Sequence, residues 1–227
     1  MPVARVHNQL TAQRRMILAS ASPRRSELLE QLGVSFRVEP AAIDEALDSR
    51  RTIDEAVAAL AERKASAVSA AFPEAVILAA DTIVLLDDRV LGKPVDAHDA
   101  ERMLWDLRGR WHVVITGIAV IDGRGTVLRC AITTRVLMRE TGLAEISAYV
   151  ATGEPLDKAG SYGIQGRGGA LVAEIDGCYT NIVGLPLCAT ADLLRRSGVV
   201  VQANRPLCTL PSGDTCPRLM PSRRAPV

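Results

Sequence analysis

The stretch AVILAAD, Ala75 to Asp81, is a run of six apolar residues that ends in one carboxylate. Such a run predicts a β-strand buried on both faces, as in a sheet covered by helices. Asp81 would stand at the carboxyl end of this strand, where open α/β sheets place their ligands, and Thr82 would present a hydroxyl beside it. An ordinary strand-end turn explains the same pair of residues equally well, so the pair needs support from the rest of the chain.

A strand and a helix are also predicted nearer the N-terminus. Met16–Ser20 is a short apolar run that suits a buried strand. Ser22 and Pro23 then form a typical helix start, with serine as the N-cap and proline at the first helical position. Three leucines between residues 28 and 32 give this helix an apolar face, and Gly33 ends it.

Two arginines occupy the first turn of that helix, where the helix dipole favours carboxylates over cations. The free N–H groups of a helix N-terminus bind anions, and two guanidinium groups added there suit a polyphosphate. We therefore predict a phosphate site formed by Ser22, Arg24 and Arg25.

Helices and strands alternate along the remaining chain. Helices are expected over 54–71, from a cap at Asp96 to Gly109, from Leu143 to Gly153 and over 186–196, and strands over 83–86, 89–91, 112–122 and 126–138. Two of the turns between strands form hairpins, so part of the sheet is antiparallel. The predicted fold class is α/β (α+β), a mixed sheet flanked by helices in one domain, 16–202, with a cleft between two lobes.

The two ends of the chain differ from this domain. Residues 1–15 carry three arginines and no carboxylate, which predicts a disordered extension, with an organelle transit peptide as the alternative. Residues 203–227 hold five of the twelve prolines and no periodic pattern, which predicts a disordered tail.

Composition argues against several classes of protein. A net charge of +1 gives no general attraction to nucleic acid or to a membrane, and an aromatic content of 3% argues against base-stacking platforms. Five cysteines without a CxxC pair argue against a disulfide framework and favour a reducing cytoplasmic setting. The three histidines show no HExxH spacing and no nucleophile elbow, which argues against zinc and serine hydrolases.

Three further segments carry groups that suit a ligand. Lys93 follows a glycine in LGKP but lacks the rest of a P-loop, so alone it is an ordinary turn lysine. Glu45 and Asp81 offer carboxylate oxygens, which Mg²⁺ and Mn²⁺ prefer. The glycines of Gly153–Gly169 allow close approach of the backbone to a ligand, and Gln165 can read a base edge through its paired donor and acceptor. A flexible linker is the alternative for this glycine-rich segment.

Taken in order, these segments resemble the Maf proteins, which are nucleoside triphosphate pyrophosphatases related in fold to the inosine triphosphatases. The matching segments are LASASPRRSELLEQLGV, IDE, ERKA, AADT, GKP, TGIAVI, GEPLDKAGSYGIQGRGG and NIVGLPL. The resemblance implies an inosine-triphosphatase-like fold, a homodimer, and cleavage between the α and β phosphates of a nucleoside triphosphate with a divalent metal, Mg²⁺ or Mn²⁺.

The resemblance also implies roles for single residues. Asp81 corresponds to the catalytic acid-base residue, and Glu45, Lys64 and Lys93 correspond to the family's glutamate and its two lysines. The arginine of SPRR, the threonine of AADT and the glutamine of YGIQG mark the subgroup that acts on dTTP and UTP; here they are Arg24, Thr82 and Gln165.

Charge compensation suggests how these residues would act on a triphosphate. The cationic groups would balance the phosphate charge, and they are Arg24, Arg25, Lys64 and Lys93. Glu45 and Asp81 would hold the metal, and Asp81 would alternatively deprotonate the attacking water. Two other functions remain open: the same chemistry on 7-methyl-GTP, and a nucleotide- or nucleic-acid-binding regulator of cell division that acts on the septum.

Overall fold

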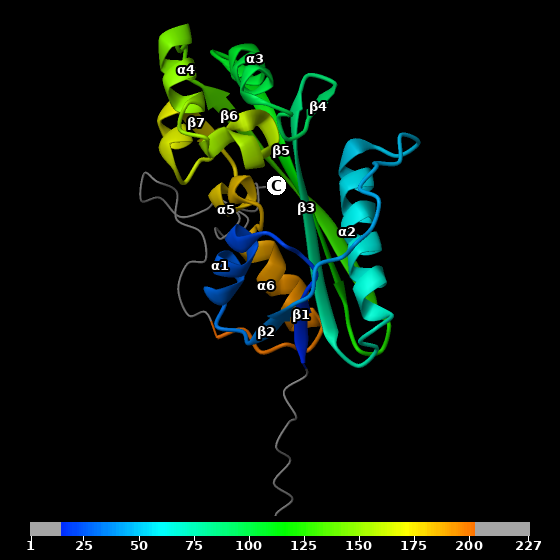
Figure 1. Cartoon of the computed structure of the whole chain (residues 1–227). Helices are drawn as coiled ribbons and strands as arrows, with labels where there is room; N and C mark the ends of the chain where they lie inside the picture. The colour runs from blue at the N-terminus through cyan, green and yellow to red at the C-terminus, as the bar shows by residue number, and fades with distance from the viewer. Residues whose placement is uncertain (1–14, 203–227) are drawn as a thin grey trace, which may run out of the picture.

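The computed structural model describes residues 15–202 (Figure 1). Apart from Arg15, the predicted extensions 1–15 and 203–227 lie outside these residues. The strands are β1 (Met16–Leu18), β2 (Phe36–Val38), β3 (Val76–Leu86), β4 (Arg89–Leu91), β5 (Trp111–Ile121), β6 (Val127–Met138) and β7 (Val172–Asp176). The α-helices are α1 (Pro23–Glu30), α2 (Ile53–Ser69), α3 (Ala97–Leu107), α4 (Leu143–Val150), α5 (Tyr179–Val183) and α6 (Leu187–Arg196). Short 3₁₀ turns η1 (Glu154–Asp157), η2 (Ala159–Ser161) and η3 (Arg167–Leu171) lie in the glycine-rich segment.

The strands form one seven-stranded mixed sheet in the order β2-β1-β3-β5-β6-β7, with β4 paired to β3. β1 runs parallel to β2 and β3, and the remaining pairs are antiparallel. Helices flank both faces (Figure 1). The prediction of a mixed sheet flanked by helices is therefore confirmed, although β2 and β7 were not predicted.

The central strand corrects one prediction. The AVILAAD run does not end its strand at Asp81, because β3 continues without a break to Leu86. Asp81 and Thr82 pair in register with Gly117 and Thr116 of β5, so their backbone groups remain within the ladder. The polar side chains of Asp81 and Thr82 do not end β3, because β5 supplies hydrogen-bond partners for its backbone groups.

The opposite edge of β3 explains why Asp81 is nevertheless accessible. β1 pairs with β3 only as far as Leu78, and β4 pairs with β3 only from Val84 onward. Within the described part of the chain, residues 79–83 therefore have no strand partner on that edge. A gap in pairing, rather than a strand end, creates the opening at the middle of the sheet.

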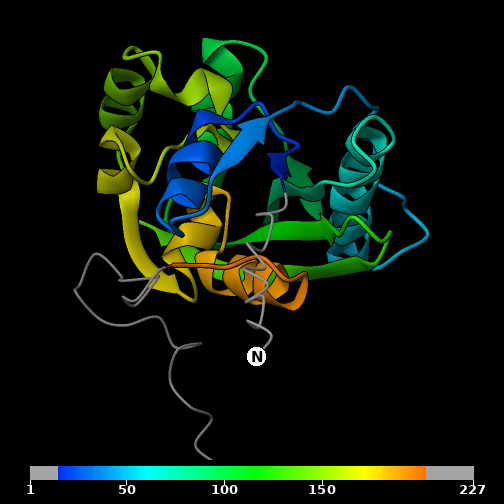
Figure 2. The same cartoon turned by 90° about the horizontal axis from the view of Figure 1, so that it is seen from below.

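Successive residues of β3 face opposite layers, as in any strand. Ile77 and Ala79 pack in a core cluster with α2, whereas Leu78 and Ala80 pack in a cluster with α1 and α6. Figure 2, seen from below, places α2 well apart from α1. Glycine at position 117 lets α2 approach β5 closely, since a Cβ there would lie 2.3 Å from the carbonyl oxygen of Val57.

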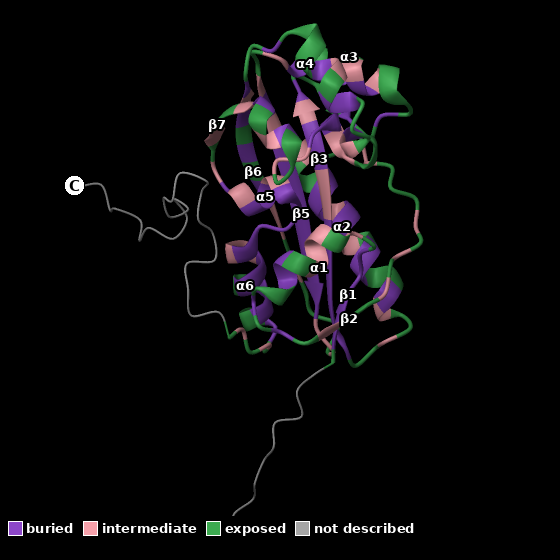
Figure 3. Cartoon of the chain, turned by 60° about the vertical axis from the view of Figure 1, so that its left-hand side comes forward, coloured by how far each residue is buried: buried purple, intermediate pink, exposed green. Residues whose placement is uncertain are grey.

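The sheet face opposite α2 carries two separate apolar clusters. One lies against α1 and α6, and the other includes β3, β5 and β6 residues packed with α3 and α4. Between them lie Thr82, Thr116 and Thr134 of the same sheet face, together with Asn181 of α5, which donates a hydrogen bond to Thr134. Figure 3 shows the buried strands at the centre of the molecule and exposed residues on the outer helical surfaces. These two clusters form the two lobes.

Among the helices of residues 15–202, none has both the length and the apolar composition needed to cross a bilayer.

Candidate active site

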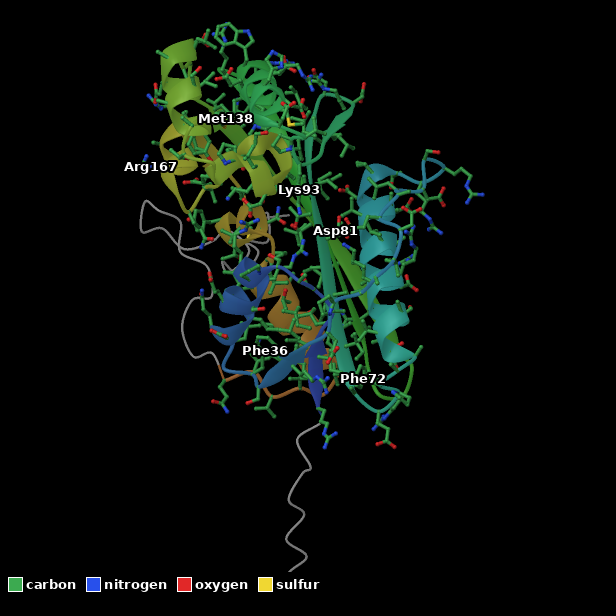
Figure 4. All side chains as sticks on the ribbon, viewed as in Figure 1. Phe36, Phe72, Asp81, Lys93, Met138 and Arg167 are labelled. Carbon is green, nitrogen blue, oxygen red and sulfur yellow. The ribbon has the colours of Figure 1, made fainter. Side chains whose placement is uncertain are left out.

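A cleft of about 1010 Å³ opens at the unpaired edge of β3, between the two lobes. All nine site residues predicted from the sequence line it: Ser22, Arg24, Arg25, Glu45, Lys64, Asp81, Thr82, Lys93 and Gln165. Figure 4 shows Asp81 midway along β3, with Lys93 above it. Segments far apart in the chain thus meet at one opening.

On the α2 side of the cleft, one lysine joins two carboxylates. The Lys64 ammonium lies 2.5 Å from Asp81 Oδ1 and 2.6 Å from Glu45 Oε1. The Lys64 side chain is 8% exposed and that of Asp81 14%, whereas the Glu45 side chain is 67% exposed. The hydrogen bond from Lys64 is the main cause that lowers the pKa of Glu45, and the charges of Lys93 and Arg25 act in the same direction. Lys64, predicted as a phosphate ligand, is here held by the carboxylates.

The segment that carries Glu45 is also attached to α2 by Arg63, the residue before Lys64. The Arg63 guanidinium donates hydrogen bonds to the carbonyl oxygens of Asp44 and of Ala46, the latter at 3.0 Å. Arg63 and Lys64 therefore hold the backbone and the side chain of this segment respectively.

On the α1 side, the Arg25 guanidinium is surrounded by protein acceptors. Its nitrogens donate to Ser20 Oγ at 3.0 Å, to Thr82 Oγ1 at 3.2 Å and to the carbonyl oxygen of Gly184 at 3.0 Å. Arg25 thereby joins the β1–α1 loop, β3 and the turn after α5. It was predicted to bind phosphate; in this structure its donors point to the protein.

The Thr82 hydroxyl has its proton and one lone pair already engaged. Thr116 donates its only hydroxyl proton to the carbonyl oxygen of Asn181, at 3.2 Å. In the 2.9 Å contact between the two threonine hydroxyls, Thr82 must therefore be the donor. Because Thr82 Oγ1 also accepts from Arg25, only a lone pair is left for the cleft. Thr82 thus offers an acceptor to a ligand.

The rim of the cleft is crossed by an ion pair. Arg24 Nη1 lies 3.2 Å from Asp157 Oδ2, and the ammonium of Lys158 lies 2.5 Å from the other oxygen of that carboxylate. Burial alone would raise the pKa of Asp157, but the hydrogen bonds and charges of Lys158 and Arg24 outweigh it, and the pKa lies below its ordinary value. Arg24 thus joins α1 to η1.

The carboxylates also fit a divalent cation. Within residues 15–202, no group of three or more His, Cys, Asp or Glu side chains gathers around one point. Mg²⁺ is commonly held by one or two carboxylates together with substrate phosphates. Asp81 and Glu45 each bind Lys64 through one oxygen and have a second oxygen, which is the donor set that such a shared site needs.

Three residues that support Arg25 and Thr82 were not predicted from the sequence. These are Ser20, Thr116 and Asn181, all neutral and mostly buried. Each lies inside a segment already matched to the family, in ASASPRR, TGIAVI and NIVGLPL. Their presence in those segments was a signal that these residues belong to the site. No charge or spacing, however, distinguished them from residues of the core.

Comparisons with known proteins agree in pointing to one family. Residues 15–197 match the family described as Maf-like protein. A dTTP/UTP pyrophosphatase of Pelotomaculum thermopropionicum is 47% identical over 184 residues, which cover 81% of this chain and 96% of that protein. A dTTP/UTP pyrophosphatase of Gloeobacter violaceus is 52% identical over 181 residues, covering 79% of this chain and 94% of the relative.

Among solved structures, a HAM1 protein from Coxiella burnetii matches with a TM-score of 0.45 and 16% identity, over 81% of this chain and 99% of that one. The sequence comparisons cover the whole cleft, from the β1–α1 loop to α6. With a family match over most of its length and relatives near 50% identity, this chain belongs to the Maf-like protein family.

Proposed function

We propose that this chain hydrolyses dTTP and UTP to the nucleoside monophosphate and pyrophosphate. The observation that carries the proposal is the cleft itself, where the carboxylates of Glu45 and Asp81 lie in one cleft with the cationic side chains of Arg24, Arg25, Lys64 and Lys93. This charge pattern suits a triphosphate that arrives with a divalent cation. The relatives named dTTP/UTP pyrophosphatase support the choice of nucleotide.

In the proposed reaction, Asp81 accepts a proton from the attacking water. The water oxygen forms a bond to the α phosphorus, the bond from that phosphorus to the bridging oxygen breaks, and pyrophosphate leaves with the electron pair. Asp81 suits this role because Lys64 fixes one carboxylate oxygen, Oδ1, and leaves the other for the water. The hydrogen bond from Lys64 also lowers the pKa of Glu45 and so favours its charged carboxylate.

The divalent cation is part of the proposal: Glu45 would hold it, and Asp81 would hold it as the alternative to acting as the base. When bound, Mg²⁺ or Mn²⁺ supplies positive charge that offsets the negative charge developing on the phosphates. Lys93 and Arg24 line the same cleft, and in this proposal they bind the remaining phosphate oxygens. Arg24 contacts Asp157 through Nη1 in this structure, and its other guanidinium N–H groups can donate to phosphate oxygens.

The base is read by neutral groups in this proposal. Thr82 offers an acceptor, which complements the N3–H donor of thymine and uracil. Gln165 brings an amide that can meet both O4 and N3–H. Both residues line the cleft.

The test is pyrophosphate release by the purified chain with Mg²⁺ or Mn²⁺, across dTTP, UTP, dCTP, dGTP and 7-methyl-GTP. We expect the highest kcat/KM on dTTP and UTP and no turnover after chelation of the metal. A higher rate on 7-methyl-GTP would favour the other subgroup. Tight DNA binding at physiological salt without any hydrolysis would instead favour a regulator of cell division.

The proposal includes a homodimer, as the family resemblance implies. Sedimentation equilibrium of the full chain is expected to give twice the 24.3 kDa mass of one chain. A single species at the monomer mass would contradict this part.

A further inference from the structure

The segment that carries Gln165 is attached to the lobe behind it by one carboxylate. Glu154, at the start of η1, accepts three hydrogen bonds: from the Tyr149 hydroxyl at 3.0 Å, from the Arg167 amide at 3.0 Å and from the Gly168 amide at 3.1 Å. Both amides lie just after Gln165 in the chain. One side chain therefore fixes the downstream end of the reading loop, which we define as Gly163–Gly168.

The upstream end of the reading loop is fixed by the partner of Glu154. The amide of Gly163 donates to the Tyr149 hydroxyl oxygen at 3.0 Å, while that hydroxyl donates to Glu154. Tyr149 is 6% exposed and packs in the core cluster of α3 and α4. Gln165 thus lies between two attachment points that share one hydrogen-bonded pair of side chains.

The glycines of this loop are required for close contact with that pair. A Cβ at Gly166 would lie 2.5 Å from Glu154 Oε1, and a Cβ at Gly168 would lie 2.5 Å from the Tyr149 hydroxyl. Neither residue has a positive φ in the structure, so backbone freedom is not the reason for glycine. The packing argues against a flexible linker at these positions and indicates a held loop.

The charge of Glu154 matters to this arrangement. Burial raises its pKa, but the hydrogen bonds from Gly168, Arg167 and Tyr149 outweigh burial and leave the pKa below its ordinary value. A carboxylate accepts at both oxygens, whereas a glutamine side chain accepts at one and donates at the other. Glutamine at this position would turn an N–H group toward a backbone N–H.

We propose that Glu154, acting with Tyr149, is a positioning residue that holds the reading loop and so sets which base Gln165 accepts. The inference rests on the proposed function for the identity of the base. A freely rotating amide can match either thymine or cytosine, because the two rings present opposite donor and acceptor patterns at C4 and N3. Because the loop is held on both sides of Gln165, the amide approaches the base edge from one position in the cleft.

The first measurement follows the loop without any nucleotide. Hydrogen exchange of the full chain is compared between the parent and Glu154→Gln, with Asp192→Asn as the matched control. Asp192 is an exposed carboxylate on α6, paired with Arg196. We expect faster exchange at Gly163, Arg167 and Gly168 in Glu154→Gln alone. Unchanged exchange at these amides would overturn the proposal.

The second measurement follows base selection without turnover. Dissociation constants of α,β-imido-dTTP and α,β-imido-dCTP are measured with the same variants and with Gln165→Ala. We expect Glu154→Gln to reduce the preference for the dTTP analogue by about 10- to 100-fold, the effect of losing a hydrogen bond to a charged group. In the double variant with Gln165→Ala, the two effects should not add, because both act through one amide. Additive effects, an unchanged preference or a parent without preference would each overturn the inference.

Tyr149→Phe covers the case in which Glu154→Gln does not fold. It removes only the hydroxyl, and we expect it to raise exchange at Gly163 and to lower the preference in the same direction. Failure of the proposed function shows itself separately, as absence of dTTP hydrolysis by the parent chain. The exchange and binding results decide the role of Glu154 whichever way that assay turns out.

Discussion

Asp81 and Thr82 are neighbours on β3, yet the two sides of the strand surround them with different chemistry. Asp81 faces α2, where the Lys64 ammonium lies 2.5 Å from Asp81 Oδ1 and 2.6 Å from Glu45 Oε1. Thr82 faces the other layer, where neutral groups and one arginine fix its hydroxyl. The side of Asp81, which we call the ionic side, carries negative charge near the opening. The side of Thr82, which we call the neutral side, fixes the direction in which the Thr82 hydroxyl proton points.

This difference shows how one strand can separate reaction from recognition. Because side chains alternate between faces, two adjacent residues reach the same cleft with independent surroundings. The pairing gap at residues 79–83 exposes both of them at once. A change on one side is therefore expected to alter turnover, and a change on the other to alter nucleotide preference.

The largest effect is expected for Asp81→Asn. Asparagine keeps the shape and removes the proton acceptor, so kcat on dTTP should fall by about 100- to 10,000-fold, the range for general acid–base catalysis. Stopped assays of pyrophosphate release measure the loss, and thermal unfolding serves as the check on folding. Turnover near that of the parent would remove Asp81 from the reaction.

Lys64→Met should have the next largest effect. The change leaves Asp81 and Glu45 without the cation between them, and kcat should fall by about 100- to 1,000-fold, as for loss of one fixed electrostatic group. Since Lys64 lowers the pKa of Glu45, its removal raises that pKa. The acid side of the pH–rate profile should therefore move to higher pH.

Arg63→Met is the matched control for Lys64, because Arg63 holds only the backbone beside Glu45. We expect it to leave the acid side of the profile in place. If Lys64→Met shifted neither kcat nor the profile, the ionic group would have no part in turnover.

The sequence predicted the members of the cleft better than their contacts. Asp81, Lys64 and Glu45 were recognised from family segments, and the start of α1 at Pro23 follows from the preference of proline for the first helical position, although the Ser22 side chain makes no capping hydrogen bond. The end of the AVILAAD strand was misplaced, because pairing with β5, which is distant in sequence, carries β3 past two polar residues. The partners of Arg25 could not be predicted either, since its three acceptors come from segments up to 159 residues away.

His112 gives a test of the neutral side that does not involve substrate. It lies on β5 on the same face as Thr116, is 2% exposed, and pairs through Nε2 with the Tyr162 hydroxyl at 2.8 Å. Burial lowers its pKa from 6.5 to about 4. Below pH 6.5 His112 binds a proton in the unfolded chain but not in the folded chain. The stability that depends on neutral His112 is therefore fully present above pH 6.5 and declines as the pH falls toward 4.

The expected decline from this one group is about 3 kcal/mol over that interval, from a shift of roughly 2.5 pKa units. Urea unfolding gives the free energy of unfolding of the parent and of His112→Gln between pH 6.5 and pH 4. The contribution of His112 is the difference between the slopes of these two free energies against pH. His98→Gln, a change at an exposed histidine of α3, should keep the slope of the parent. Equal slopes for the parent and His112→Gln would contradict a buried neutral imidazole.

The smallest expected effect is also the most specific to the neutral side. Thr116→Val removes the acceptor for the Thr82 proton, which is then free to point into the cleft and donate. A donor there favours the unprotonated N3 of cytosine over the N3–H of thymine. The ratio of kcat/KM for dTTP to kcat/KM for dCTP should therefore fall about tenfold, which corresponds to the net contribution of one hydrogen bond. Thr116→Ser keeps the hydroxyl and should keep the ratio. If valine and serine gave the same ratio, the direction of the Thr82 proton would not contribute to selection, and recognition would rest on Gln165 and its loop alone.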